Sequence, residues 1–301
     1  MNATHLSDPV SISRLIVFSI IPFFLIVGLV GNIFVIYIYA RQSQKSNVET
    51  FILILAVIDL IGCIFGMPLE MAELCLVIQS KYLCKLYTFI TVTYSILSSF
   101  ILLTIAIERY RSICCPLSKQ LDPKLRNTLI IFLIVTSVSL VLLPVVYIES
   151  VPFSHESYSC DFQGSFLWPY ILTAFIIQCI LVLSMAVLYS FVQKNIKQHL
   201  MKKQSKEPFQ QEQINHTKII LFSISVLYFV SFTPNLLFRA LYPYCRDSIL
   251  LQIFKVILYR TWILSSSLNF IVYGFCNKIF WKSFVNIFSR DKSDFEMDKK
   301  F

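Results

Sequence analysis

A single carboxylate lies in the middle of a long apolar run, where a charged side chain is costly to bury. Asp59 occupies the sequence Leu-Ala-Val-Ile-Asp-Leu, and an acidic residue at the centre of a membrane helix costs about 2.5–3.5 kcal/mol on insertion scales. Polar residues also fall inside other apolar runs, namely Asn32, Ser98, Ser265, Ser266 and Asn269. Such residues either pack helices together through hydrogen bonds or bind a cation or a proton. Both interpretations require them to face the interior of a helix bundle.

Two further features could serve a conformational change. Glu108-Arg109-Tyr110 ends the third apolar run, where an ion pair at the membrane surface would contribute little to stability. Pro234 lies inside the sixth run and removes a backbone hydrogen bond, which predicts a kink in that helix. The kink is either static or a hinge.

Intramembrane catalysis and transport are not favoured by the sequence. The four histidines, which would be needed for a zinc hydrolase, all fall outside the apolar runs: His5, His155, His199 and His216. A transporter would need interrupted helices in two matching halves, and we find one central proline with no counterpart. We therefore expect that the protein is not an enzyme.

The apolar runs predict an all-α membrane protein. Hydrophobic residues make up 56% of the chain and charged residues 14%, whereas a soluble domain is about 25% charged. Seven runs reach the roughly 20 residues that a membrane helix needs: Leu15–Ala40, Phe51–Ile78, Leu86–Ile107, Leu129–Ile148, Phe166–Val192, Ile219–Tyr242 and Ile249–Phe275. The prediction is an extracellular N-terminus at 1–13, a seven-transmembrane helix bundle at 14–275, and a short amphipathic eighth helix with a cytoplasmic tail at 276–301.

The basic residues predict the orientation of this bundle. Of the 26 Lys and Arg residues, 19 lie on the side that holds the C-terminus and seven on the other side. Because positive charge gathers on the cytoplasmic side of a membrane, we expect a multi-pass plasma-membrane protein with its N-terminus outside. The net charge of +9 then reflects orientation in the lipid bilayer and not binding to nucleic acid. Asn2 begins a glycosylation sequon on the outer side.

From about residue 14 to 290, the sequence resembles the rhodopsin-like (class A) G protein-coupled receptors. Seven motifs appear in the family order: Gly31-Asn32, Leu55–Leu60 (LAVIDL), Cys84 at 25 residues before Arg109, Glu108-Arg109-Tyr110, Phe232-Thr233-Pro234, Asn269–Tyr273 (NFIVY) and Asn277–Phe284. The departures indicate a divergent branch that resembles invertebrate neuropeptide receptors. The fourth span has no Trp, Leu181 replaces the fifth-span proline, and Phe270 replaces the seventh-span proline.

The resemblance implies a switch between two packings of one bundle. The sixth helix would swing outward at its cytoplasmic end around Pro234 to admit a heterotrimeric G protein, and Phe232 would sense the ligand. Arg109 would be held by Glu108 in the inactive packing. Ile214 replaces an acidic partner of Arg109, which predicts raised basal activity. The implied switch and coupling residues are Glu108, Arg109, Tyr110, Tyr189, Pro234, Asn269 and Tyr273.

The resemblance also implies a disulfide, an ion site and a membrane-surface helix. Cys84 and Cys160 would join the third span to the second outer loop. No cofactor is implied except an allosteric sodium ion, bound by Asp59, Ser98, Ser265, Ser266 and Asn269. Phe280, Phe284, Ile287 and Phe288 would form the apolar face of the eighth helix.

The possible classes of ligand are narrowed mainly by exclusion. Ile263 stands where opsins carry the retinal lysine, and Thr91 stands where amine receptors carry an aspartate. The outer half holds charges of both signs, which favours an extracellular peptide as ligand over a lipid or another small molecule; a non-signalling decoy of the same fold stays open. The predicted ligand-binding residues are Thr91, Ser95, Arg239, Lys255, Glu70 and Phe232. Alternatively, Arg260 pairs with Glu70 and stabilises the helices.

Overall fold

The structure is a computed structural model that describes residues 9–75, 78–117, 121–154, 157–162, 167–202, 208–241 and 248–276. Its elements, in chain order, are α1 (Pro9–Ala40), α2 (Asn47–Ile61), η2 (Gly62–Gly66), α3 (Met67–Leu74), α4 (Lys81–Cys114), α5 (Pro123–Tyr147), β1 (Ile148–Ser154), β2 (Ser157–Phe162), α6 (Leu167–Lys202), α7 (Pro208–Leu241), α8 (Ile249–Leu258) and α9 (Trp262–Cys276).

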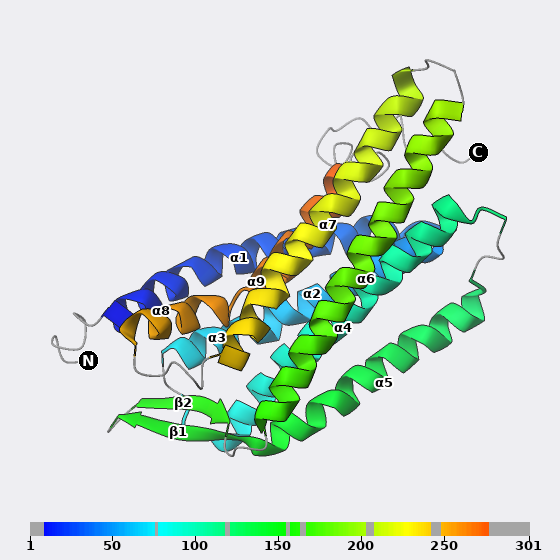
Figure 1. Cartoon of the computed structure of the whole chain (residues 1–301). Helices are drawn as coiled ribbons and strands as arrows, with labels where there is room; N and C mark the ends of the chain where they lie inside the picture. Colours follow the sequence, from blue (N-terminus) through cyan, green and yellow to red (C-terminus); the bar gives the residue numbers. More distant parts are fainter. Residues whose placement is uncertain are drawn as a thin grey trace, which may run out of the picture.

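The helices form one elongated bundle (Figure 1). The β1–β2 hairpin closes one end of it, which we call the hairpin end, and α6 and α7 project beyond the other helices at the opposite end. Because that opposite end carries Arg109, we call it the Arg109 end. Helix α4 contacts α2, α5, α6 and α7, so it runs through the middle of the bundle.

Length and composition agree with a membrane bundle. Among the described residues, six helical segments are long and apolar enough to cross a membrane, and a shorter apolar segment, Val226–Leu241, belongs to α7. Large apolar side chains such as Phe23, Ile131 and Leu183 are more than 60% exposed, whereas Asp59 and Ser98 are fully buried. Apolar residues outside and polar residues inside are the arrangement expected of a bundle that has lipid as its solvent.

Each predicted span falls on helix, but two spans that we predicted as single helices are interrupted. The second changes at Gly62–Gly66 from α-helix to one turn of π-helix, and α3 follows with Pro68 in its first turn. The seventh breaks between Leu258 and Trp262. At this break the Thr261 hydroxyl contacts the Leu258 carbonyl oxygen at 3.0 Å, so a side chain satisfies main-chain polarity that a continuous helix would satisfy itself. The same hydroxyl lies 2.8 Å from the Ser231 carbonyl oxygen and so links the break to α7.

The structure adds a hairpin to the predicted all-α architecture. Strands β1 and β2 pair antiparallel, with Ser150 opposite Cys160, in the segment predicted as an outer loop. The register shifts between Pro152 and Ser154. Two strands of this length are marginally stable alone, so their attachment to α4 described below is needed to hold them.

Several predicted features lie outside the described residues. They are the Asn2 sequon, residues 1–8 of the N-terminal segment 1–13, and the amphipathic helix and tail after Cys276. Ile214 and Tyr273 belong to helices α7 and α9, but their side chains are also outside the description. Their predicted roles stay predictions.

Candidate ligand and switch sites

A cavity of about 400 Å³ lies between α4, α5, α6, α7 and the start of α9. It contains four of the six predicted ligand-binding residues: Thr91, Ser95, Phe232 and Arg239. Most of its wall is apolar, with Phe100, Leu143 and Ile177 among its residues. An apolar cavity with few polar groups is the usual form of a ligand site, and its volume suits a small molecule or a few peptide side chains.

A smaller polar chamber of about 70 Å³ adjoins the cavity under the hairpin. The two spaces share five residues: Tyr87, Thr91, Val92, Arg239 and Tyr259. Four cationic side chains line the chamber, Arg14, Arg239, Lys255 and Arg260, against one carboxylate, that of Glu73. Lys255, also predicted for the ligand site, therefore reaches the chamber and not the larger cavity.

Arg239 is held in a defined orientation where the two spaces meet. Its Nε donates to Asn235 Oδ1 at 2.9 Å, and its guanidinium lies 4.1 Å from the centre of the Tyr259 ring. Asn235 Nδ2 in turn donates to the Tyr259 carbonyl oxygen at 2.5 Å. These contacts use one edge and one face of the guanidinium, and within the described part of the chain its two terminal nitrogens have no acceptor, so they could bind one from a ligand.

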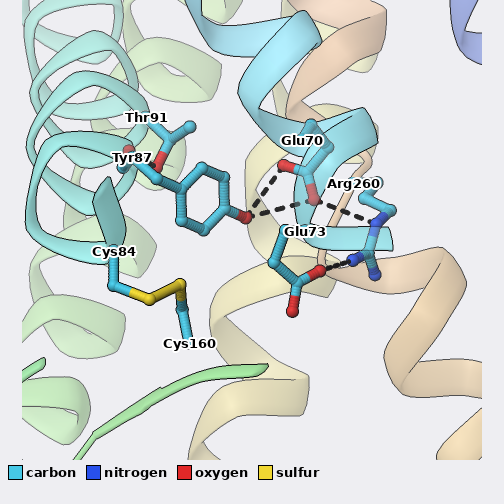
Figure 2. Close-up of a disulfide and its surroundings, with 7 residues drawn as sticks. All are labelled: Glu70, Glu73, Cys84, Tyr87, Thr91, Cys160 and Arg260. Carbon is cyan, nitrogen blue, oxygen red and sulfur yellow. Dashed lines mark hydrogen bonds and ion pairs between the residues drawn. A yellow bond between two sulfur atoms is a disulfide. The ribbon is translucent and has the colours of Figure 1, made fainter. Parts of the chain in front are cut away.

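The predicted disulfide is present and forms part of the chamber wall. Cys84 of α4 and Cys160 of β2 are bonded, with 5.4 Å between their Cα atoms, and Figure 2 shows the bond beside the buried charges. Cys160 itself lines the chamber. A cross-link over 76 residues restricts the unfolded chain, and here it also fixes the hairpin over the chamber.

Glu70 belongs to a buried ionic cluster and lines neither space, which corrects its assignment to the ligand-binding set. Its Oε1 lies 2.9 Å from Arg260 Nε, and its carboxylate accepts from Tyr87 Oη at 3.0 and 3.1 Å and from Trp262 Nε1 at 3.2 Å. Arg260 Nη2 also donates to Glu73 (Figure 2). We call Glu70, Glu73, Tyr87, Arg260 and Trp262 the ionic cluster. Its contacts match the alternative in which Arg260 stabilises the helices.

The polar residues near the centre of the bundle converge on Asp59. Its Oδ2 accepts from Asn269 Nδ2 at 2.9 Å, and the same nitrogen donates to Ser265 Oγ at 3.2 Å. Its Oδ1 accepts from Tyr94 Oη at 2.9 Å. Tyr94 was not among the predicted residues, although it precedes Ser98 by four positions and therefore shares a face of the third span with it.

At the Arg109 end, Glu108 contacts Arg111 and Asn47, and its pairing with Arg109 in the inactive packing stays a prediction. Glu108 Oε1 lies 3.2 Å from Arg111 Nη1, and Glu108 Oε2 accepts from Asn47 Nδ2 at 3.3 Å. Residues three apart share a face of a helix and adjacent residues do not, so Glu108 reaches Arg111. The buried Tyr189 hydroxyl lies within electrostatic range of Arg109.

Comparison with known proteins agrees with this architecture. A family model described as 7 transmembrane receptor (rhodopsin family) matches residues 31–273. Neuromedin-U receptor 2 of Rattus norvegicus is 25% identical in an alignment of 309 positions, which covers 95% of this chain and 76% of that receptor. Cephalotocin receptor 1 of Octopus vulgaris is 30% identical over 140 residues, or 46% of this chain and 35% of that receptor. Cholecystokinin receptor type A of Mus musculus is 35% identical over 101 residues, or 33% and 23%.

The family match covers the helices that form the cavity, the Asp59 site and the Glu108-Arg109-Tyr110 motif. It confirms the predicted class of protein, a multi-pass receptor of the membrane and not an enzyme. The chain belongs to the rhodopsin family of seven-transmembrane receptors, the G protein-coupled receptors.

Proposed function

We propose that the protein is a plasma-membrane receptor that binds an extracellular peptide at the hairpin end and activates a heterotrimeric G protein at the Arg109 end. The observation that carries the proposal is the pair of adjoining spaces, one apolar and one cationic, beneath a disulfide-linked hairpin. The relatives support a peptide ligand, since they are receptors for neuromedin-U, cephalotocin and cholecystokinin.

The two spaces suggest what the deepest part of the peptide carries. The larger cavity would take one or two bulky apolar side chains, because its wall is mostly apolar. The chamber would take an acidic group, because its cationic side chains outnumber its carboxylate and Arg239 is oriented by Asn235 and Tyr259. A carboxylate next to an aromatic or aliphatic side chain therefore fits both spaces at once.

Signal transfer would follow from the position of Phe232. This residue lines the cavity and lies two positions before Pro234 in α7. A ligand shifts the equilibrium only if it binds one packing more tightly than the other. Contact with Phe232 gives the ligand such a preference, because any movement of α7 changes the shape of the cavity.

The first experiment screens a peptide library on cells that express the receptor, with calcium and cyclic AMP as readouts. Each acidic peptide is paired with its amidated analogue. We expect responses to acidic peptides, and a response to neither kind of peptide would contradict the proposal. Replacing Arg109 with Ala should abolish signalling and preserve peptide binding. If the wild type bound peptide without any G protein response, the protein would be a non-signalling decoy.

Substitution of Arg239 tests the acidic contact directly. Arg239→Gln should weaken the response to an acidic peptide about 10- to 100-fold, because a hydrogen bond to a charged group is worth about 1.5–3 kcal/mol. The response to the amidated analogue should change less. Lys81→Gln is the matched control, since Lys81 is an exposed cation near the hairpin end that lines neither space. Equal losses in the two variants would assign the effect to general surface charge.

One observation favours a second candidate, a receptor for an apolar lipid or small molecule. The cavity wall includes Leu140, Leu143 and Ile177, which are 40–43% exposed on the membrane-facing surface of α5 and α6. A ligand dissolved in the bilayer would reach the cavity from this side. Activation by a lipid in cells that respond to no peptide would select this candidate.

A further inference from the structure

The residues that contact Asp59 form a set of hydrogen bonds that differs from a cation site. A hard cation such as sodium is held by oxygen atoms that direct lone pairs toward it. Here each carboxylate oxygen already accepts a hydrogen bond, one from Tyr94 Oη and the other from Asn269 Nδ2, both at 2.9 Å. Asn269 thus presents its N–H group to Asp59, and not the oxygen that would bind a cation.

Two of the three remaining predicted sodium ligands, Ser265 and Ser266, are also engaged within the protein, whereas the buried Ser98 hydroxyl has no hydrogen-bond partner among the described residues. Ser265 Oγ accepts from Asn269 Nδ2 at 3.2 Å, and Ser266 Oγ donates to the Ile263 carbonyl oxygen at 3.1 Å. Asn32, on the neighbouring helix, donates to the Ser266 carbonyl oxygen at 2.8 Å. Asp59, Asn269 and Ser265 therefore bond to one another and not around a central position.

Packing fixes the Tyr94 hydroxyl on Asp59. The Tyr94 side chain is 4% exposed, and its ring centre lies 5.3 Å from that of Trp262 and 6.4 Å from that of Phe232. A Cβ atom added at Gly62 would stand 3.1 Å from Tyr94 Cδ2, so the ring rests directly on the helix that carries Asp59. The residue types at 62 and 94 therefore complement each other.

We propose that the Tyr94 hydroxyl takes the place of a sodium ion at Asp59, so that this receptor is stabilised by an internal hydrogen bond where a cation would otherwise bind, and sodium does not regulate it. Phe232 and Trp262 contact Tyr94 and also line the ligand cavity. Tyr94 is thus a positioning residue that links the floor of the cavity to the buried carboxylate.

The test measures thermal unfolding of the purified full-length receptor, so it needs neither ligand nor G protein and is independent of the proposed function. Unfolding is compared in sodium chloride and in N-methyl-D-glucamine chloride at equal ionic strength, which cancels general screening. The melting temperature of the wild type should be the same in both salts within about 1 °C. A rise of about 3 °C or more in sodium, the shift expected for an ion at many times its dissociation constant, would overturn the proposal.

Variants at Tyr94 test whether this side chain is what excludes the cation. Tyr94→Ser and Tyr94→Asn both open space beside Asp59, and we expect at least one of them to gain a sodium-specific rise of about 3 °C or more. Adding Asp59→Asn to that variant should abolish the gain. Tyr87→Ser is the matched control. Tyr87 also lies on α4 and donates to a buried carboxylate, that of Glu70, but Arg260 already pairs with Glu70. A sodium effect in none of the Tyr94 variants, or an equal effect in Tyr87→Ser, would overturn the assignment.

Discussion

Two tyrosines of helix α4 donate hydrogen bonds to two buried carboxylates, and the two sites differ in how they stabilise the buried carboxylate. In the ionic cluster, Tyr87 donates to Glu70, and Arg260 supplies a full positive charge at 2.9 Å. At Asp59, Tyr94 and Asn269 supply only neutral donors among the described residues. The two tyrosines are seven positions apart in the sequence, so they lie two turns apart on one face of the helix. On the proposal above, one buried carboxylate is stabilised by a cationic side chain and the other by two neutral hydrogen-bond donors.

The largest expected effect follows from removing the cation of the ionic cluster. Arg260→Gln leaves Glu70 and Glu73 buried without their cation, and loss of one partner of a buried ion pair typically costs about 3–5 kcal/mol. The free energy of unfolding, followed by thermal denaturation of the purified receptor, should fall by about this amount, with reduced surface expression. Lys255→Gln provides the control, since Lys255 lines the same chamber. A similarly small loss in both variants would contradict a stabilising role for Arg260.

The next effect compares the two tyrosines directly. Tyr94→Phe should reduce the free energy of unfolding by about 1.5–3 kcal/mol, the usual worth of a hydrogen bond to a charged group. Tyr87→Phe should cost less, because Arg260 and Trp262 still contact Glu70. Both changes keep the ring and remove one oxygen, so a single thermal denaturation assay measures the difference. A greater loss at Tyr87 would reverse the proposed contrast.

The smallest expected effect concerns the ion pair at the Arg109 end. The Arg111 side chain is 35% exposed, and partly exposed pairs contribute about 0–1 kcal/mol. Arg111→Gln should therefore change the free energy of unfolding by less than about 1 kcal/mol in the same assay. A loss close to that of Arg260→Gln would show that Glu108 and Arg111 form a more tightly coupled pair than their exposure suggests.

The spans were predictable because lipid leaves the backbone few choices. Each membrane segment must satisfy its own N–H and C=O groups, which makes a long apolar run a helix with little dependence on its neighbours. The convergence of Ser265 and Asn269 on Asp59 was predictable for a related reason, since buried polar residues must find partners inside the bundle.

The choice among partners was only partly predictable from the sequence. The pairing of Arg260 with Glu70 was one of two alternatives, and Glu108 and Arg111 lie three residues apart on one helix. The contact of Tyr94 with Asp59 depends on ångström-scale separations between helices that hydropathy does not specify. The interruptions at Gly62–Gly66 and before Trp262 were missed for a different reason. Composition remains apolar across Gly62–Gly66, and the carbonyl oxygen of Tyr259 at the second interruption finds its donor, Asn235 of α7, only after packing.

The interruption in the seventh span has a mechanical consequence for α7. Thr261 donates to the main chain of α7 at Ser231, and Asn235 of α7 donates to the main chain at Tyr259. These reciprocal fastenings lie on either side of Pro234, the one position between them that lacks a backbone donor. The short part of α7 that follows Pro234, toward the hairpin, is thereby attached to the seventh span close to the proline. A rotation of α7 about this region should therefore produce its largest displacement at the other end of the helix, some tens of ångströms away, where α7 projects with α6 beyond the other helices.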